Sequence, residues 1–164
     1  NQREDDSVFK NENLRKAISY AIDRDALANQ ILVDGSVTTN GIVPADMMQS
    51  PKDGTDFAKD AGTTLETDAA KAKEYWEKAQ KELGKDKLTV NLLSSDDDRT
   101  KKITEFVKGN LEEALPGLTV ELSPVPFSVR LDRSNSGDFD MVYAGWSADY
   151  PDASSFLDLF ATGN

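Results

Sequence analysis

The sequence predicts an α/β fold in which a small mixed or parallel sheet is flanked by helices. Two segments near the amino terminus carry apolar residues at helical spacing. From Leu88 onward the spacing changes to the alternation of a strand, and a second alternating segment follows one amphipathic helix. This order is typical of a parallel strand–helix–strand crossover. The length of 164 residues is enough for one domain with a sizeable core.

Residues 1–10 are polar, and we expect them to be disordered or frayed. An Asn-rich start can then cap a first helix, whose apolar face comprises Leu14, Ala17, Ile18, Ala21 and Ile22. Asp23 can cap a second helix that carries Leu27 and Ile31 and stops at Asp34-Gly35. Residues 35–66 are rich in Gly, Thr, Pro and Asp, which predicts a long irregular segment, a kind that is often functional.

Thr67-Asp68 opens a third helix that Gly84 terminates. Its apolar face comprises Ala69, Ala72, Trp76, Ala79 and Leu83. Trp76 could be a ligand platform, but a tryptophan at this helical spacing is more often a core residue.

Alternating apolar residues predict strands at Leu88–Leu92 and Leu118–Leu122, with a helix between them that carries Ile103, Phe106, Val107 and Leu111. Pro116-Gly117 ends that helix. The remaining expected elements are a short helix around Phe127–Arg133, a strand over Phe139–Ala144 and a short helix with Phe156, Leu157 and Phe160.

Composition excludes several classes of function. The formal net charge of −11 disfavours binding to nucleic acid or to anionic membranes, both of which require a basic face. The chain has neither cysteine nor histidine, which excludes disulfides, Ser-His-Asp triads and histidine bases. We expect no cofactor and no metal. The Asp96-Asp97-Asp98 run could bind Ca²⁺ or Mg²⁺, but it lacks the ligand spacing of an EF-hand and suits helix capping better.

The segment after the last expected strand is the most informative part of the chain. Trp146 and Tyr150 flank Asp149 where the strand Phe139–Ala144 ends and a proline-bearing turn begins. A carboxylate enclosed by aromatic surface suits a cationic ligand. The alternatives are a core tryptophan beside a solvated aspartate, or an acid/base pair of a small hydrolase formed by Asp149 and Asp152.

Two separated stretches resemble one family. Residues 13–24, NLRKAISYAIDR, are similar to the N-x-R-x-A-I-x-Y-A-I-D-R helix of the oligopeptide-binding proteins of ABC importers, the family 5 extracellular solute-binding proteins. Gly41–Pro44 resembles the G-x-x-P segment of that family. Phe139-Asp140-Met141 followed by residues 145–152, GWSADYPD, resembles its DFD…GW-x-x-D-Y-x-D-P signature.

The resemblance implies one lobe of a two-lobed periplasmic-binding-protein-like fold, with residues 11–164 as an incomplete C-terminal lobe. It implies no catalysis, so the chain is not expected to be an enzyme. The expected function is the substrate-binding component of an ABC peptide importer that binds extended oligopeptides. The expected partners are an oligopeptide and the permease subunits, without nucleic acid or direct membrane insertion. The location would be the outer face of the cell membrane, through a lipid anchor, or the periplasm.

The resemblance also assigns roles to site residues. Asp149 would pair with the α-amino group of the peptide, with Trp146 and Tyr150 as walls. The backbone of Ala144, Gly145 and Trp146 would bind an extended peptide. Tyr143 stands where some Gram-negative members have an arginine that meets the peptide's carboxylate, so this anchor must differ here. The sequence around Asp149 resembles that of Gram-positive members of the family. Other solutes remain open, namely a dipeptide, nickel, a sugar or a pheromone peptide.

Overall fold

The computed structural model describes residues 1–2, 6–39 and 41–161. The chain divides into two compact units: unit 1 comprises Asn1–Ser36 and Thr67–Ala144, and unit 2 comprises Val37–Glu66 and Gly145–Asn164. The length had predicted one domain. The segment of residues 37–66 adds little to a common core, because Val43 is the one buried side chain among its described residues.

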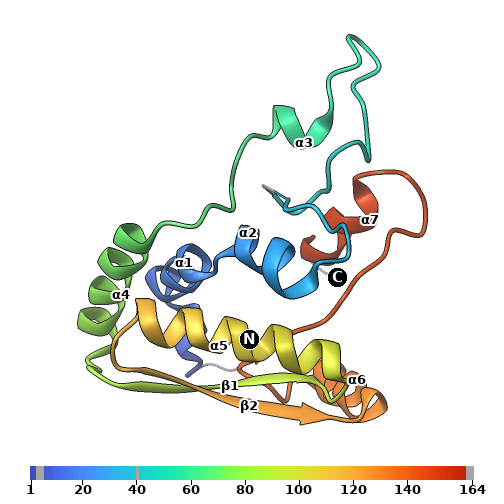
Figure 1. Cartoon of the computed structure of the whole chain (residues 1–164). Coiled ribbons are helices and arrows are strands. Elements are labelled where there is room, and N and C mark those ends of the chain that lie inside the picture. The colour runs from blue at the N-terminus through green and yellow to red at the C-terminus, as the bar shows by residue number, and fades with distance from the viewer. Residues whose placement is uncertain (3–5, 40, 162–164) are drawn as a thin grey trace. The chain divides into compact units, whose positions relative to one another are not determined.

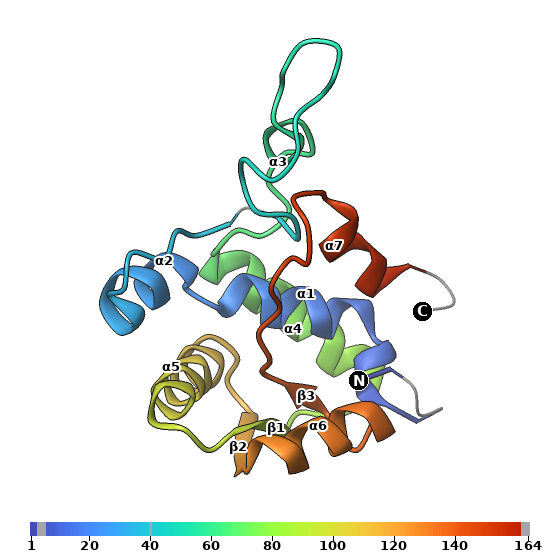
Figure 2. The same ribbon diagram turned by 90° about the vertical axis from the view of Figure 1, so that its right-hand side faces the viewer.

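Two helices of unit 1 were predicted well. Helix α1 spans Glu12–Ala21, and the Asn11 side chain caps it by accepting from the Leu14 amide at 2.9 Å. Helix α4 spans Ala69–Leu83, is capped by Asp68 and ends at Gly84 in the left-handed conformation. The two helices lie side by side, as Figures 1 and 2 show. Both predicted caps are confirmed. The first amide groups of a helix have no acceptor within the helix, and the short polar side chain of the cap residue supplies one.

The second predicted helix differs at its end. Asp23 caps α2 (Arg24–Ala26) as expected, but the chain continues as a π-helix, η2, over Leu27–Leu32. The stop lies at Val33, in the left-handed region at φ 47°, and not at Asp34-Gly35. The Val33 amide donates to the Ala28 carbonyl at 3.1 Å, which is the five-residue spacing of a π-helix. The helix therefore ends before Gly35, the residue type that usually follows a helix end.

The sheet of unit 1 has three parallel strands in the order β2-β1-β3. Strand β1 is Leu88–Ser95, β2 is Leu118–Val125 and β3 is Met141–Val142. Helix α5, Asp98–Ala114, connects β1 to β2, which confirms the predicted parallel crossover (Figure 1). Strand β3 is shorter than the expected Phe139–Ala144, because its pairing with β1 covers only Leu92↔Met141 and Leu93↔Val142.

The core lies on one face of this sheet. Alternate residues of β1 and β2 pack there against α1, α4 and α5. Trp76 is 2% exposed, and its indole donates to the Pro116 carbonyl at 2.8 Å, which confirms the core interpretation. Helix α6, Phe127–Ser136, meets the other face, because Arg133 Nη1 donates at 3.3 Å to the hydroxyl of Ser123, which alternates with the core residues Val120 and Leu118.

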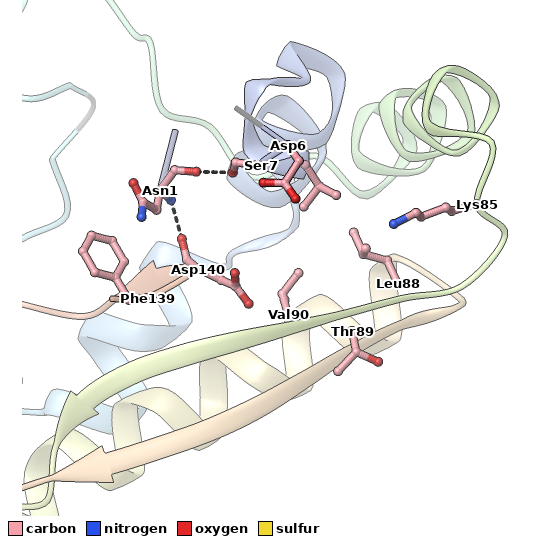
Figure 3. Close-up of a pocket in the computed structure, with 10 residues that line it drawn as sticks. Asn1, Asp6, Ser7, Lys85, Leu88, Thr89, Val90, Phe139 and Asp140 are labelled. Atoms are coloured by element: carbon pink, nitrogen blue, oxygen red, sulfur yellow. Dashed lines mark hydrogen bonds between the residues drawn. The ribbon is translucent and has the colours of Figure 1, made fainter. Parts of the chain in front are cut away.

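Part of the amino-terminal stretch that we expected to be frayed is ordered against unit 1. Val8–Lys10 form a short 3-10 helix, η1, and Phe9 is buried in the core. The Asn1 amino group donates to the Asp140 carbonyl, and the Ser7 hydroxyl donates to the Asn1 carbonyl (Figure 3). Burial of Phe9 explains the order, since one large apolar side chain can tie down a polar terminal segment.

Unit 2 contains little regular structure. Its elements are α3 (Phe57–Asp60), α7 (Ser154–Leu157) and the 3-10 helix η3 (Asp158–Phe160), with a bridge between Gln49 and Asp56. The long irregular segment and the last short helix are therefore as expected, apart from α3. Across the described ranges of both units, no helix has the length and apolar character needed to span a membrane.

Candidate ligand-binding site

Strand β3 leads into a stretch of backbone that has no hydrogen-bond partner in the described parts of the chain. The Tyr143 amide donates to the Leu93 carbonyl at 2.9 Å and extends the pairing by one residue. In residues 144–149 no backbone group forms a hydrogen bond with any part of the chain that the structure describes, and all of these residues except Ala148 are exposed. Free N–H and C=O groups in an extended segment can pair with another extended chain.

Two aromatic side chains of this stretch are held in place yet remain accessible. The Trp146 indole donates to the Ser155 carbonyl at 2.7 Å, while 53% of the residue stays exposed. The Tyr150 hydroxyl lies 3.1 Å from the Ser154 hydroxyl, and Tyr150 is 50% exposed. Both contacts are to the start of α7, so this short helix fixes the orientation of two half-exposed rings.

The two carboxylates of the loop differ in their surroundings. Asp152 accepts from the Ser154 amide at 2.8 Å and from its hydroxyl at 2.6 Å, and these bonds lower the pKa of Asp152. Asp149 is exposed and has no hydrogen bond or ion pair within the described residues. Asp152 therefore shapes the turn that begins α7, and Asp149 is left available for a ligand.

Tyr143 is placed differently from the other predicted residues. It is half-buried and packs against the core of unit 1, and burial raises the pKa of its phenol. Arg99 and Asp97 are the charged groups that also act on this pKa, the first lowering it and the second raising it. The boundary between the units falls after Ala144, so Tyr143 and Ala144 belong to unit 1, whereas Gly145, Trp146, Asp149 and Tyr150 belong to unit 2.

Other candidate sites have structural explanations. Asp97 caps α5 by accepting from the Thr100 amide at 2.9 Å, as expected for the Asp96–Asp98 run. No cluster of potential metal ligands occurs among the residues that the structure describes. A polar pocket of about 230 Å³ lies where β1 begins, lined in part by Leu88, Val90 and Asp140 (Figure 3). Ligands of parallel sheets bind at the opposite, carboxyl ends of the strands.

The sequence profile described as "Bacterial extracellular solute-binding proteins, family 5 Middle" matches residues 1–164, which is the whole chain. The chain belongs to this family. The match agrees with the resemblance carried by residues 13–24 and 145–152.

The proteins similar to this chain include ones named as peptide-binding proteins. A dipeptide-binding protein of Lactococcus lactis subsp. cremoris is 39% identical over 157 residues, which are 95% of this chain and 28% of that protein. A crystal structure of a peptide-binding protein of a peptide ABC transporter is 64% identical, with a TM-score of 0.96 over 100% of this chain and 72% of that one. Listeria monocytogenes OppA bound to peptide is 41% identical, with a TM-score of 0.95 over 99% of this chain and 32% of that one.

The chain thus spans about a quarter of the length of the curated relatives it matches. Its parallel sheet flanked by helices agrees with the expected fold class, and the chain shares its fold with these two solved structures.

One buried charged residue was not predicted from the sequence. Arg130 of α6 is only 9% exposed, and its Nε is enclosed without a hydrogen-bond partner in the described structure. No signal in the sequence separates it from Arg133, which lies three residues further along the same expected helix. The difference arises from how α6 packs against the sheet, which periodicity does not reveal.

Proposed function

We propose that the complete protein binds peptides as the substrate-binding component of an ABC importer, and that Asp149 receives the ammonium group of the ligand. The observation that carries this proposal is the exposed Asp149 carboxylate, which has no partner among the described residues and shares its loop with two rings held by α7. The alternative of a core tryptophan does not fit a Trp146 that is half exposed.

The free backbone supports the second part of this proposal. Unpaired groups over residues 144–149 suit recognition of a peptide main chain, which does not depend on peptide sequence. Binding through main-chain groups and one ammonium would accept many peptides. The relatives named as peptide-binding proteins support the same ligand class.

The proposal includes a transport role without catalysis. The family consists of solute-binding proteins, and Asp152 is engaged by Ser154, which leaves Asp149 without a second free carboxylate in its loop. Paired carboxylates are what a hydrolase of this kind would need. The protein would act outside the cell membrane or in the periplasm, held there by a lipid anchor in the first case, and would present its peptide to permease subunits.

The experiment that tests this proposal is calorimetric titration of the complete protein with tetra-alanine and with N-acetyl-tetra-alanine. We expect Asp149→Asn to weaken binding of the free peptide by about 2–5 kcal/mol, because the ammonium loses its charged partner in a desolvated contact. Asp86→Asn is the matched control, since Asp86 is an exposed carboxylate before the amino end of β1. Equal affinity of Asp149→Asn and wild type for the free peptide would refute the assignment.

Ligand length is tested in the same experiment. A relative named as a dipeptide-binding protein makes di-alanine the natural comparison with tetra-alanine. Tighter binding of tetra-alanine would support an oligopeptide binder, and tighter binding of di-alanine would make the protein a dipeptide binder that uses the same Asp149 contact.

A further inference from the structure

Arg130 is a buried cation without a counter-charge among the residues that the structure describes. The residue is 9% exposed, and no hydrogen bond or ion pair reaches its guanidinium from any described residue. Its guanidinium lies over the Phe127 ring, whose centroid is 4.8 Å from Arg130 Cζ. A buried charge is costly unless it is paired, so a position of this kind calls for an anionic partner.

The neighbouring Arg133 provides a comparison within the same helix. Arg133 Nε donates to Asp138 Oδ2 at 2.8 Å, and its Nη1 donates to the Ser123 hydroxyl at 3.3 Å. The Arg133 side chain is 28% exposed, so the fold pairs the more accessible arginine and leaves the buried one unpaired. The missing partner of Arg130 is therefore to be sought outside the described chain.

The position of Arg130 in unit 1 indicates where that partner arrives. Phe127 begins α6 directly after Pro126 and the end of β2 at Val125, so a guanidinium beside the Phe127 ring lies near the carboxyl end of β2. The three strands are parallel, and Ala144 follows β3 at the same edge of the sheet. Ligands of open parallel sheets bind outside this edge.

We infer that Arg130 receives a carboxylate of the bound peptide. The inference rests on the proposed peptide-binding function and names a chemical preference for it. The enclosed Nε leaves Nη1 and Nη2 to form paired hydrogen bonds with both carboxylate oxygens, a geometry that arginine favours. Phe127, which is 60% exposed, would cover one face of the guanidinium in the complex.

The spacing of the sheet fits a short peptide. Strand β1 separates β2 from β3, so the ends of β2 and β3 lie two strand spacings apart, about 10 Å. An extended peptide covers this distance with about three residues. A peptide that pairs with the backbone at Ala144 can thus place either its terminal carboxylate or an acidic side chain at Arg130.

Calorimetry on the complete protein distinguishes these two sources. The probes are tetra-alanine, its carboxy-terminal amide, and the tetra-alanine peptides with glutamate or glutamine at each position in turn. Wild type should bind one carboxylate peptide about tenfold or more tighter than its uncharged counterpart. A preference lost on amidation identifies the terminal carboxylate, and a preference for glutamate over glutamine at one position identifies a side chain.

Arg130→Met should remove this preference and leave the affinity for the uncharged counterpart within about threefold of wild type. It should also unfold at the same or a higher temperature, since it removes an unpaired buried charge, whereas loss of a purely structural arginine would lower that temperature. Arg133→Met, the matched control, should keep the preference. Arg130→Lys should keep part of it, because a lysine retains the charge without the paired geometry.

The outcomes separate the two proposals. If Arg130→Met keeps the carboxylate preference, or if wild type binds tetra-alanine without preferring any carboxylate, the assignment of Arg130 is wrong and peptide binding stands. If wild type binds none of the peptides, the proposed function and the inference that rests on it both fail.

Discussion

Three glycines of unit 1 test how backbone conformation and steric space determine stability. Substitution by alanine should change the free energy of unfolding differently at each of them. Gly109 lies within α5, and a Cβ added there would meet no atom within 4 Å, so Gly109→Ala should stabilise the helix by about 0.5–1 kcal/mol. Gly84 also has open space but sits at φ 64°, so Gly84→Ala should cost about 1–2 kcal/mol from backbone conformation alone.

Gly117 combines this strain with a clash. Its φ is 98°, and an added Cβ would lie 2.4 Å from the Asp86 carbonyl oxygen, which is backbone and cannot rotate away. The Gly117 carbonyl also accepts from the Leu88 amide at 3.0 Å, so relief of the clash would disturb the start of β1. We expect Gly117→Ala to cost about 3–4 kcal/mol, the sum of left-handed strain and a forced backbone shift.

Urea unfolding followed by Trp76 fluorescence measures these differences in unit 1, in a Trp146→Phe background that leaves Trp76 as the one tryptophan. For a chain of this size, 1 kcal/mol corresponds to a shift of about 2–4 °C in the melting temperature. Equal effects of Gly84→Ala and Gly117→Ala would refute the clash, and a destabilising Gly109→Ala would refute the open environment assigned to that position.

Two further predictions concern a cap and the core. The pKa of Asp97 is lowered by hydrogen bonds from Thr100, so its stabilising contribution is present above the unfolded pKa of about 4 and is lost as pH falls through the lower folded value. Thermal melts from pH 6 downward should therefore show a weaker acid destabilisation in Asp97→Asn, and identical pH profiles would contradict the cap. Trp76→Phe should cost about 2–4 kcal/mol in urea unfolding, because it leaves a void and removes the bond to Pro116; a loss under about 1 kcal/mol would contradict the packing.

Local signals account for the parts of the fold that the sequence predicted. Asn11, Asp68 and Gly84 mark helix ends through bonds within one turn, and the alternation at Leu88 and Leu118 follows from one face being buried. Val33 was not predicted as a helix end, because the π-helix that precedes it depends on packing and not on the residue that local rules favour.

The features that could not be predicted from the sequence depend on tertiary packing. The expected strand Phe139–Ala144 is rich in apolar residues but pairs with β1 over only two of them, since pairing depends on the neighbouring strand. Among site residues, Trp146 is half exposed and Asp149 has no partner in the described chain, and the binding role of both stays a prediction. The isolation of Arg130 results from the contact of α6 with the sheet, for which no local pattern exists.

The central claim is that the Asp149 carboxylate pairs with the ammonium of a peptide. It is tested most directly by a thermodynamic cycle of wild type and Asp149→Asn, each titrated with tetra-alanine and with its N-acetyl form. Acetylation should weaken binding to wild type by about 2–5 kcal/mol and should have little further effect on Asp149→Asn, because the charged pair is then already lost. Equal losses on acetylation in both proteins would show that the ammonium is bound elsewhere and would contradict the account.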